Sequence, residues 1–194
     1  MKELILARHG ESEFSLKQLV NGDPGVACPL TPAGREQART LGAELGDVDL
    51  VAVTEFERVR ETAELALGER DAPCLVLPEL NDPRYGEFEG GALDAYREWV
   101  WERGPLVAPT GGEHRGEIAA RYAAGFRKLL ERPEETILLV AHSLPIRYVL
   151  DAAGGLSPRA KIAMVEYAVP YRLGREQLDR AVGVLEAWAA APAF

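Results

Sequence analysis

The chain contains almost no cysteine. Cys28 and Cys74 are the only two among 194 residues, too few for a disulfide framework or a zinc ribbon. No run approaches the roughly 18 consecutive apolar residues that a membrane span needs. In the amino-terminal stretch MKELILARHGE, charged residues follow the short apolar run too closely for a signal peptide. We therefore expect a cytoplasmic protein with free thiols and no membrane partner.

Positive charge is also scarce. Lys and Arg number 22 against 31 Asp and Glu, which gives a net charge of −9. Nucleic-acid binding requires a dominant basic surface, so this balance argues against it. An acidic protein that binds an anion must concentrate its few arginines in one pocket. Histidine is scarcer still, with only three in the chain.

Short apolar runs alternate with amphipathic stretches along the chain. The apolar runs predict strands at 4–7, 49–53, 74–77 and 136–141, with a weaker edge strand at 163–169. The amphipathic stretches predict helices at 33–45, 54–67, 92–103, 113–130, 143–154 and around 178–188. Thr31-Pro32 and the T-x-x-E sequence at Thr54 are typical helix starts.

This alternation predicts an α/β fold: a three-layer sandwich in which a mostly parallel central sheet is flanked by helices on both faces. No repeat or linker divides the sequence, and its length suits one domain. We therefore expect a single domain over 1–194, with a lid or insert at about 80–112.

Two of the three histidines directly follow predicted buried strands. His9 is preceded by Arg8 after the first strand, and His142 follows the fourth strand and precedes a helix. In open α/β sheets, ligands bind at the carboxyl ends of the strands. Either histidine alone could simply be bonded to backbone, but together they predict a site. A catalytic metal would need a further ligand, and His114, the third histidine, suits an exposed helix start better.

Arginines near the same strand ends suit an anionic ligand. Arg58 begins the helix after the second strand, although Glu61 could instead pair with it, and Arg60 suits surface pairing. Guanidinium groups and helix amino-terminal amides both bind phosphate oxygens well. Nearby positive charge would also keep His9 neutral, the form with a free lone pair.

Six ordered blocks of the sequence resemble the histidine phosphatase superfamily, which includes the cofactor-dependent phosphoglycerate mutases. The blocks are RHGES at 8–12, PLTPAGREQA at 29–38, TEFERVRETA at 54–63, LNDPRYGEFEG at 80–90, GGE at 111–113 and LVAH at 139–142. The resemblance implies a phosphoglycerate mutase-like fold. It also implies catalysis through a phosphohistidine, without a metal or other cofactor.

The resemblance also assigns roles to individual residues. It implies that His9 attacks phosphorus while Arg8, Arg58 and His142 hold the phosphoryl oxygens. The acid–base carboxylate falls at Asp82, where glutamate is more usual; without the resemblance, Asn-Asp-Pro indicates only a turn.

Two serines depart from the pattern of the family. Ser15 stands in place of a common asparagine, and Ser143 in place of glycine. Both are candidate phosphate-binding residues. The Ser143 hydroxyl could cap the helix that follows or donate to the ligand.

These features favour a metal-independent phosphomonoesterase acting on a small phosphorylated metabolite. One alternative is a cofactor-dependent phosphoglycerate mutase, although the acidic 87–102 segment suits retention of a bisphosphate poorly. The other is a phospho-ligand sensor without turnover, suggested by the short Asp82 and by Ser143. The sequence leaves open whether the protein is a monomer or a homodimer.

Overall fold

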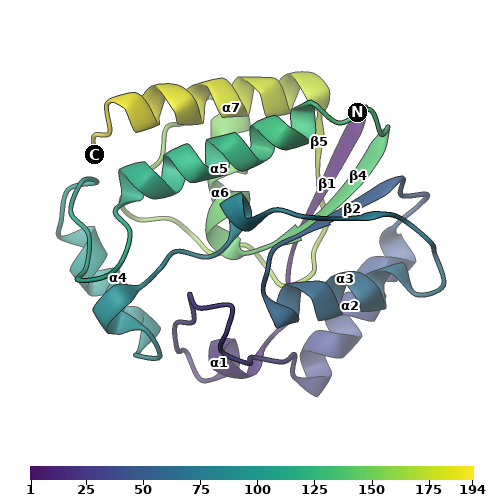
Figure 1. Cartoon of the computed structure of the whole chain (residues 1–194), viewed down its shortest axis with the longest axis horizontal. Coiled ribbons are helices and arrows are strands. Elements are labelled where there is room, and N and C mark those ends of the chain that lie inside the picture. Colours follow the sequence, from purple (N-terminus) through teal and green to yellow (C-terminus); the bar gives the residue numbers. More distant parts are fainter.

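The central feature of the fold is a five-stranded sheet. The computed structural model describes residues 1–194 and orders the strands β3-β2-β4-β1-β5 (Figure 1). The strands are β1 (Glu3–Arg8), β2 (Leu50–Val53), β3 (Cys74–Val76), β4 (Thr136–Ala141) and β5 (Tyr171–Gly174). All neighbours are parallel except β5, which runs antiparallel to β1 at one edge. The predicted mostly parallel sheet is confirmed.

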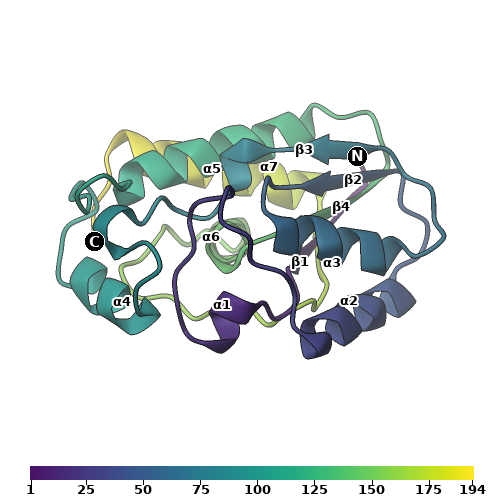
Figure 2. The same cartoon turned by 60° about the horizontal axis from the view of Figure 1, so that its bottom comes forward.

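Helices cover both faces of this sheet. The helices are α1 (Glu13–Leu16), α2 (Pro32–Glu44), α3 (Glu57–Leu67), α4 (Leu93–Trp101), α5 (Arg115–Leu130), α6 (Ser143–Ala153) and α7 (Arg175–Ala190). Figure 2 shows α5, α6 and α7 on one side of the sheet and α2 and α3 on the other. The predicted three-layer α/β architecture is therefore confirmed.

Alternation along the strands divides the core into two apolar clusters. In β1, Leu4 and Leu6 pack with α5, α6 and α7, whereas Ile5 and Ala7 pack with α2 and α3. Successive strand residues point to opposite faces, so a strand that is apolar throughout supplies both cores. The register pairs Arg8 with Ala141, which places the residues after β1 and β4 side by side.

One of the two predicted helix starts is correct. Thr31 caps α2 by accepting a hydrogen bond from the amide of Gly34 at 3.0 Å. The predicted capping box at Thr54 is wrong, because α3 begins after Phe56 and has no side-chain cap. The buried Thr54 hydroxyl instead contacts His142, and the Glu57 carboxylate accepts from the amide of Cys28.

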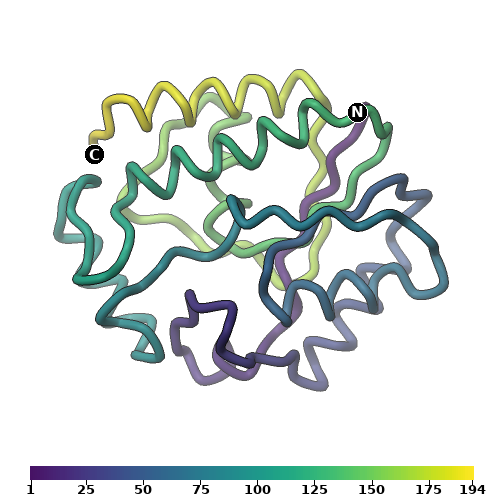
Figure 3. The backbone as a smooth tube through the Cα atoms, in the orientation of Figure 1, coloured from purple at the N-terminus to yellow at the C-terminus, as the bar shows by residue number.

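The predicted edge strand at 163–169 is also wrong. Only Tyr167 forms an isolated bridge, with Arg8, and the fifth strand lies later, at β5. The backbone of Val165 is committed to side chains, because its carbonyl accepts from Arg8 and its amide donates to Ser143. Figure 3 traces this connection between α6 and β5. The backbone groups of Val165 are thus bonded to the side chains of Arg8 and Ser143 rather than to a neighbouring strand.

A third, small apolar cluster holds α4 against the body of the protein. Its buried members are Val20, Tyr85, Tyr96 and Val100. Figure 1 shows α4 and α1 on the side of the molecule opposite the amino terminus. No helix in the structure has the length and apolar character needed to cross a membrane.

Candidate active site

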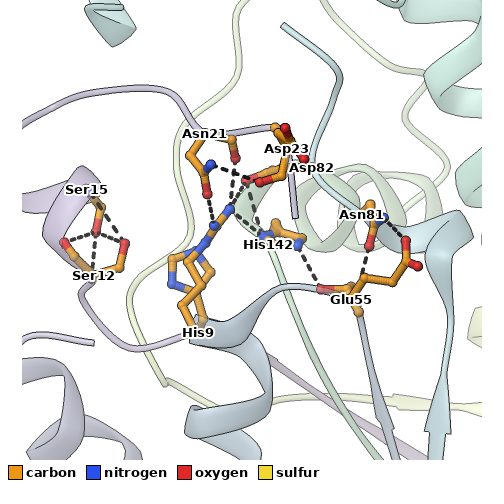
Figure 4. A network of polar contacts seen from close by, with 12 residues as sticks. His9, Ser12, Ser15, Asn21, Asp23, Glu55, Asn81, Asp82 and His142 are labelled. Atoms are coloured by element: carbon orange, nitrogen blue, oxygen red, sulfur yellow. Dashed lines mark hydrogen bonds and ion pairs between the residues drawn. The ribbon is translucent and has the colours of Figure 1, made fainter. Parts of the chain in front are cut away.

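A cavity of about 360 Å³ lies between the end of β1 and the start of α3, and polar residues from both line it. Arg8, His9, Arg58 and Asp82 line it, and His142 lies beside them at the end of β4. The ring centroids of His9 and His142 are 5.5 Å apart. The five residues expected to form the core of the site therefore come together in space. Figure 4 shows how His9, Asp82 and His142 lie in it.

His9 is buried and oriented by two contacts. Its Nδ1 lies 2.7 Å from the carbonyl oxygen of Gly10, so Nδ1 carries the proton and donates it. Its Nε2 then carries the lone pair and accepts from Nε of Arg58 at 3.2 Å. Burial, followed by the charges of Arg58 and Arg8, holds the pKa of His9 well below its usual range. His9 is thus a neutral imidazole, and the lone pair on its Nε2 is held by Arg58 alone.

The space beside His9 is restricted by the close packing of Gly10. A Cβ atom at Gly10 would lie 2.3 Å from the carbonyl oxygen of Gly34 in α2. The glycine after the histidine is therefore a steric requirement, because any side chain would push the strand end away from α2.

Arg58 is the hub of the polar network. Its Nη2 donates to Oδ2 of Asp82 at 2.9 Å and to the backbone carbonyl of Asn21 at 3.1 Å. Its Nη1 donates to the side-chain oxygen of Asn21. Glu61, the alternative partner considered from the sequence, is bonded to Arg35 instead. Arg58 is therefore directed into the cavity by contacts from three separate segments.

Arg8 is also buried, and it has no carboxylate partner. Its Nη1 donates to the carbonyl of Val165 at 3.0 Å, and its guanidinium stacks 3.8 Å from the ring centroid of Tyr167. Its Nε is buried without any hydrogen-bond partner. A buried guanidinium with an unsatisfied donor is suited to an incoming anion.

His142 connects Asp82 to the end of β2. Its Nδ1 lies 3.1 Å from Oδ2 of Asp82, and its Nε2 lies 3.0 Å from the hydroxyl of Thr54. The carboxylate selects the tautomer that donates from Nδ1, so Nε2 accepts from Thr54. Burial lowers the pKa of His142, and the opposing effect of Asp82 does not restore it.

The Asp82 carboxylate is ionised. Burial would raise its pKa, but His142 and then Arg58 outweigh burial and hold the pKa well below the usual range. The preceding residue, Asn81, bonds the amide and the carboxylate of Glu55, and its carbonyl accepts from Arg121. These contacts draw the loop inward, and Asp82 reaches the cavity despite its short side chain.

The two serines line the cavities but are bonded elsewhere. The Ser15 hydroxyl contacts the backbone and side chain of Ser12 in the capping box of α1. The Ser143 hydroxyl accepts a hydrogen bond from the amide of Val165 at 3.0 Å. It does not cap α6, and it lies on the side of the helix that faces the site. In this structure both hydroxyls hold backbone segments that border the cavity.

Sequence reasoning missed Asn21 and Tyr167. Asn21 orients Arg58, and Tyr167 covers Arg8; both line the cavity. For Tyr167 the sequence offers only a place between Val165 and Val169 on one face of the expected edge strand, and this does not distinguish it from its apolar neighbours. Asn21-Gly22-Asp23 is typical of a turn and carries no further signal.

His114, the third histidine, lies outside this network. It caps α5 by accepting from the amide of Glu117 at 3.1 Å. The structure contains no group of three or more His, Cys, Asp or Glu side chains placed to hold a metal ion.

Comparison with known proteins agrees with the fold. The family model described as "Histidine phosphatase superfamily (branch 1)" matches residues 4–186. A 2,3-bisphosphoglycerate-dependent phosphoglycerate mutase from Bartonella henselae is 31% identical, with 80% of this chain and 83% of that protein covered. The corresponding mutase from Brucella ovis is 30% identical over 96% of this chain and 99% of its own length.

Solved structures with this fold include phosphatases. The alpha-ribazole phosphatase of Shigella flexneri matches with a TM-score of 0.76 and 28% identity, covering 88% of this chain and 89% of that one. A mycobacterial glucosyl-3-phosphoglycerate phosphatase shares the fold with a TM-score of 0.75 and 24% identity, covering 90% and 93%. The chain belongs to branch 1 of the histidine phosphatase superfamily and is an enzyme of the phosphatase class.

Proposed function

We propose that this enzyme is a metal-independent phosphomonoesterase that acts through a phosphohistidine on a small phosphorylated metabolite. The observation that carries the proposal is the neutral His9 whose Nε2 faces a cavity lined by Arg8 and Arg58. Two guanidinium groups can neutralise a phosphoryl group, and the lone pair on Nε2 can attack its phosphorus.

In the first step, Nε2 of His9 forms a bond to phosphorus and the bond from phosphorus to the leaving oxygen breaks. Asp82 is placed to give that oxygen a proton. Because the low pKa of Asp82 keeps its carboxyl ionised, the proton must arrive with the substrate, as it does in a phosphate monoanion. Phosphate binding to Arg58 would also release Asp82 from its contact with that arginine.

In the second step, water attacks phosphorus and breaks its bond to His9. Asp82, now a carboxylate again, accepts a proton from that water. Inorganic phosphate takes that proton from Asp82 and leaves as the monoanion, and His9 returns to its neutral form. Arg8, Arg58 and His142 hold the phosphoryl oxygens in both steps.

Hydrolysis of 4-nitrophenyl phosphate in excess EDTA tests this mechanism. We expect wild type to turn over and His9→Ala to lose activity on the order of 10³-fold or more, because the covalent route is gone. His114→Ala is the matched control, since that histidine lies outside the cavity, and it should retain activity. Full activity in His9→Ala would refute the proposal.

The mutase remains a second candidate because two curated relatives at 30–31% identity carry that name. A mutase would return the phosphoryl group to the bound intermediate rather than to water. Interconversion of 3- and 2-phosphoglycerate that depends on the bisphosphate would establish it. A sensor without turnover would bind phosphate tightly, yet rapid quenching with substrate would yield no acid-labile phosphohistidine.

A further inference from the structure

Three arginines in this protein are buried: Arg8, Arg58 and Arg115. Burying a guanidinium is costly unless an anion and further hydrogen bonds compensate it. Arg58 has that compensation from Asp82. Arg8 has none, and the family resemblance gives it the role of binding a phosphoryl group.

Arg115 shows the same features as Arg8. It is 6% exposed, no carboxylate pairs with it, and its Nε is buried without a partner. Its single hydrogen bond runs from Nη1 to the phenolic oxygen of Tyr148 at 2.9 Å, and a phenol carries no charge near neutral pH. The charge of Arg115 is thus uncompensated within the chain.

Arg115 also lines a cavity that leads to the reactive groups. This cavity has a volume of about 100 Å³, and Arg8, His9 and Asp82 form part of its wall. Most of the remaining lining is apolar, contributed by α4 and the 162–164 segment. Besides Arg8 and Arg115, one more cation lines it: Arg97, which is paired with Asp94 at 3.3 Å. Apart from Arg8, which is expected to bind the phosphoryl group, Arg115 is therefore the one buried arginine without a carboxylate partner in the wall of this cavity.

The size of the cavity restricts what can reach Arg115. A water molecule occupies about 30 Å³ in the liquid, so about 100 Å³ accommodates a carboxylate and the carbon atoms that carry it. The apolar lining disfavours a heavily hydroxylated group, because it offers few hydrogen-bond partners.

We propose that Arg115 is a specificity-determining residue that binds a carboxylate on the leaving group of the substrate. The substrate is then a phosphate ester of a small carboxylic acid, with the phosphate between Arg8 and Arg58 and the carboxylate at Arg115. This inference rests on the proposed phosphomonoesterase activity. Its first test measures turnover and needs that activity, whereas its second test measures binding and does not.

Matched substrates measure the preference directly. The 2-, 3- and 4-carboxyphenyl phosphates are compared with the corresponding carbamoylphenyl phosphates, which have the same shape but no charge. A charge-assisted hydrogen bond to a buried group discriminates by about ten- to a hundredfold. We expect that advantage in kcat/KM for at least one carboxylate isomer with wild type.

Arg115→Met should reduce the ratio of kcat/KM for the carboxylate to kcat/KM for the matched amide to about one, mainly by raising KM for the carboxylate. Arg115→Lys should recover part of the ratio. Arg127→Met is the control, because Arg127 lies on the same helix but at the surface, paired with Glu186; its ratio should equal that of wild type. A wild-type ratio near one for every isomer, or an unchanged ratio in Arg115→Met, would overturn the proposal.

A binding measurement separates this inference from the proposed function. Calorimetry with wild type compares 3-phosphonopropionate with propylphosphonate, neither of which can be hydrolysed as an ester. Tighter binding of the carboxylate, by about tenfold or more, supports the role of Arg115 even if no substrate turns over. Equal affinities would refute it even if phosphatase activity is present, and neither result depends on the folding of a variant.

Discussion

Nδ1 of His142 lies 3.1 Å from Oδ2 of Asp82, and the same oxygen lies 2.9 Å from Nη2 of Arg58. The carboxylate thus occupies the space between two groups that are expected to hold phosphoryl oxygens. Figure 4 shows Asp82 and His142 converging in this way next to Asn21. An incoming phosphate must compete with this internal anion, and its arrival frees Asp82 to carry a proton.

Asp82→Asn should affect substrates according to their leaving groups. An amide cannot deliver the proton, so hydrolysis of an alkyl phosphate should fall by about 10²–10⁴-fold in kcat. The 4-nitrophenolate ion leaves without protonation, and its release should fall far less. The measurement is kcat for both substrates in wild type, in Asp82→Asn and in Asp179→Asn, a surface control. An equal loss on both substrates would exclude Asp82 as the acid.

Thr54→Val should weaken both the fold and the reaction. The hydroxyl of Thr54 is the partner of Nε2 of His142 in a fully buried position. Valine would leave that nitrogen unsatisfied, at a cost of about 1–3 kcal/mol in the free energy of unfolding. His142 would also lose its fixed orientation, and we expect kcat/KM to fall about tenfold.

Urea unfolding and steady-state kinetics check the effect of Thr54→Val. Thr40→Val is the matched control, because the Thr40 hydroxyl bonds only to a carbonyl of its own helix at the surface. If the two variants behave alike, the Thr54–His142 contact contributes nothing.

Stability should fall on mild acidification. Burial holds the pKa values of His9 and His142 below the ordinary value of about 6.5, so below that pH the unfolded chain binds protons that the folded chain does not. Each histidine then lowers the free energy of unfolding by up to about 1.4 kcal/mol per pH unit. Asp82 acts in the same direction only below pH about 4, where the unfolded carboxyl begins to protonate.

Urea titrations between pH 7 and 5 measure this slope. His9→Gln removes one of the two histidines. The slope of the free energy of unfolding against pH should then fall by up to about 1.4 kcal/mol per pH unit, which corresponds to one proton. A slope that is the same in wild type and in His9→Gln would show that folding does not lower the pKa of His9.

Local patterns predicted most of the fold. Continuous apolar runs located β1 through β4, and the Thr31-Pro32 start of α2 proved correct, because these signals depend on neighbours in the chain. The predictions at Thr54 and at 163–169 failed for a shared reason. In both places, polar groups that would complete local structure are bonded to His142, Arg8 or Ser143 from distant segments.

The site shows the same division. His9, Arg8, Arg58 and His142 follow from motifs and strand ends, whereas Asn21 and Arg115 depend on tertiary contacts. A partial signal for Arg115 was present. It shares a helical face with Ile118, Ala119 and Tyr122, all fully buried, and a charged residue in such a stripe requires an explanation.

The parallel register of β1 and β4 sets Arg8 level with Ala141, and this single alignment fixes the spacing of both histidines. The two imidazoles thus follow neighbouring strands in the interior of the sheet, whereas α4 and the connection before β5 supply much of the wall of the cavity around Arg115. Exchange of those outer segments between relatives would retarget the enzyme and leave its phosphorus chemistry intact, so new substrates can be acquired without rebuilding the centre.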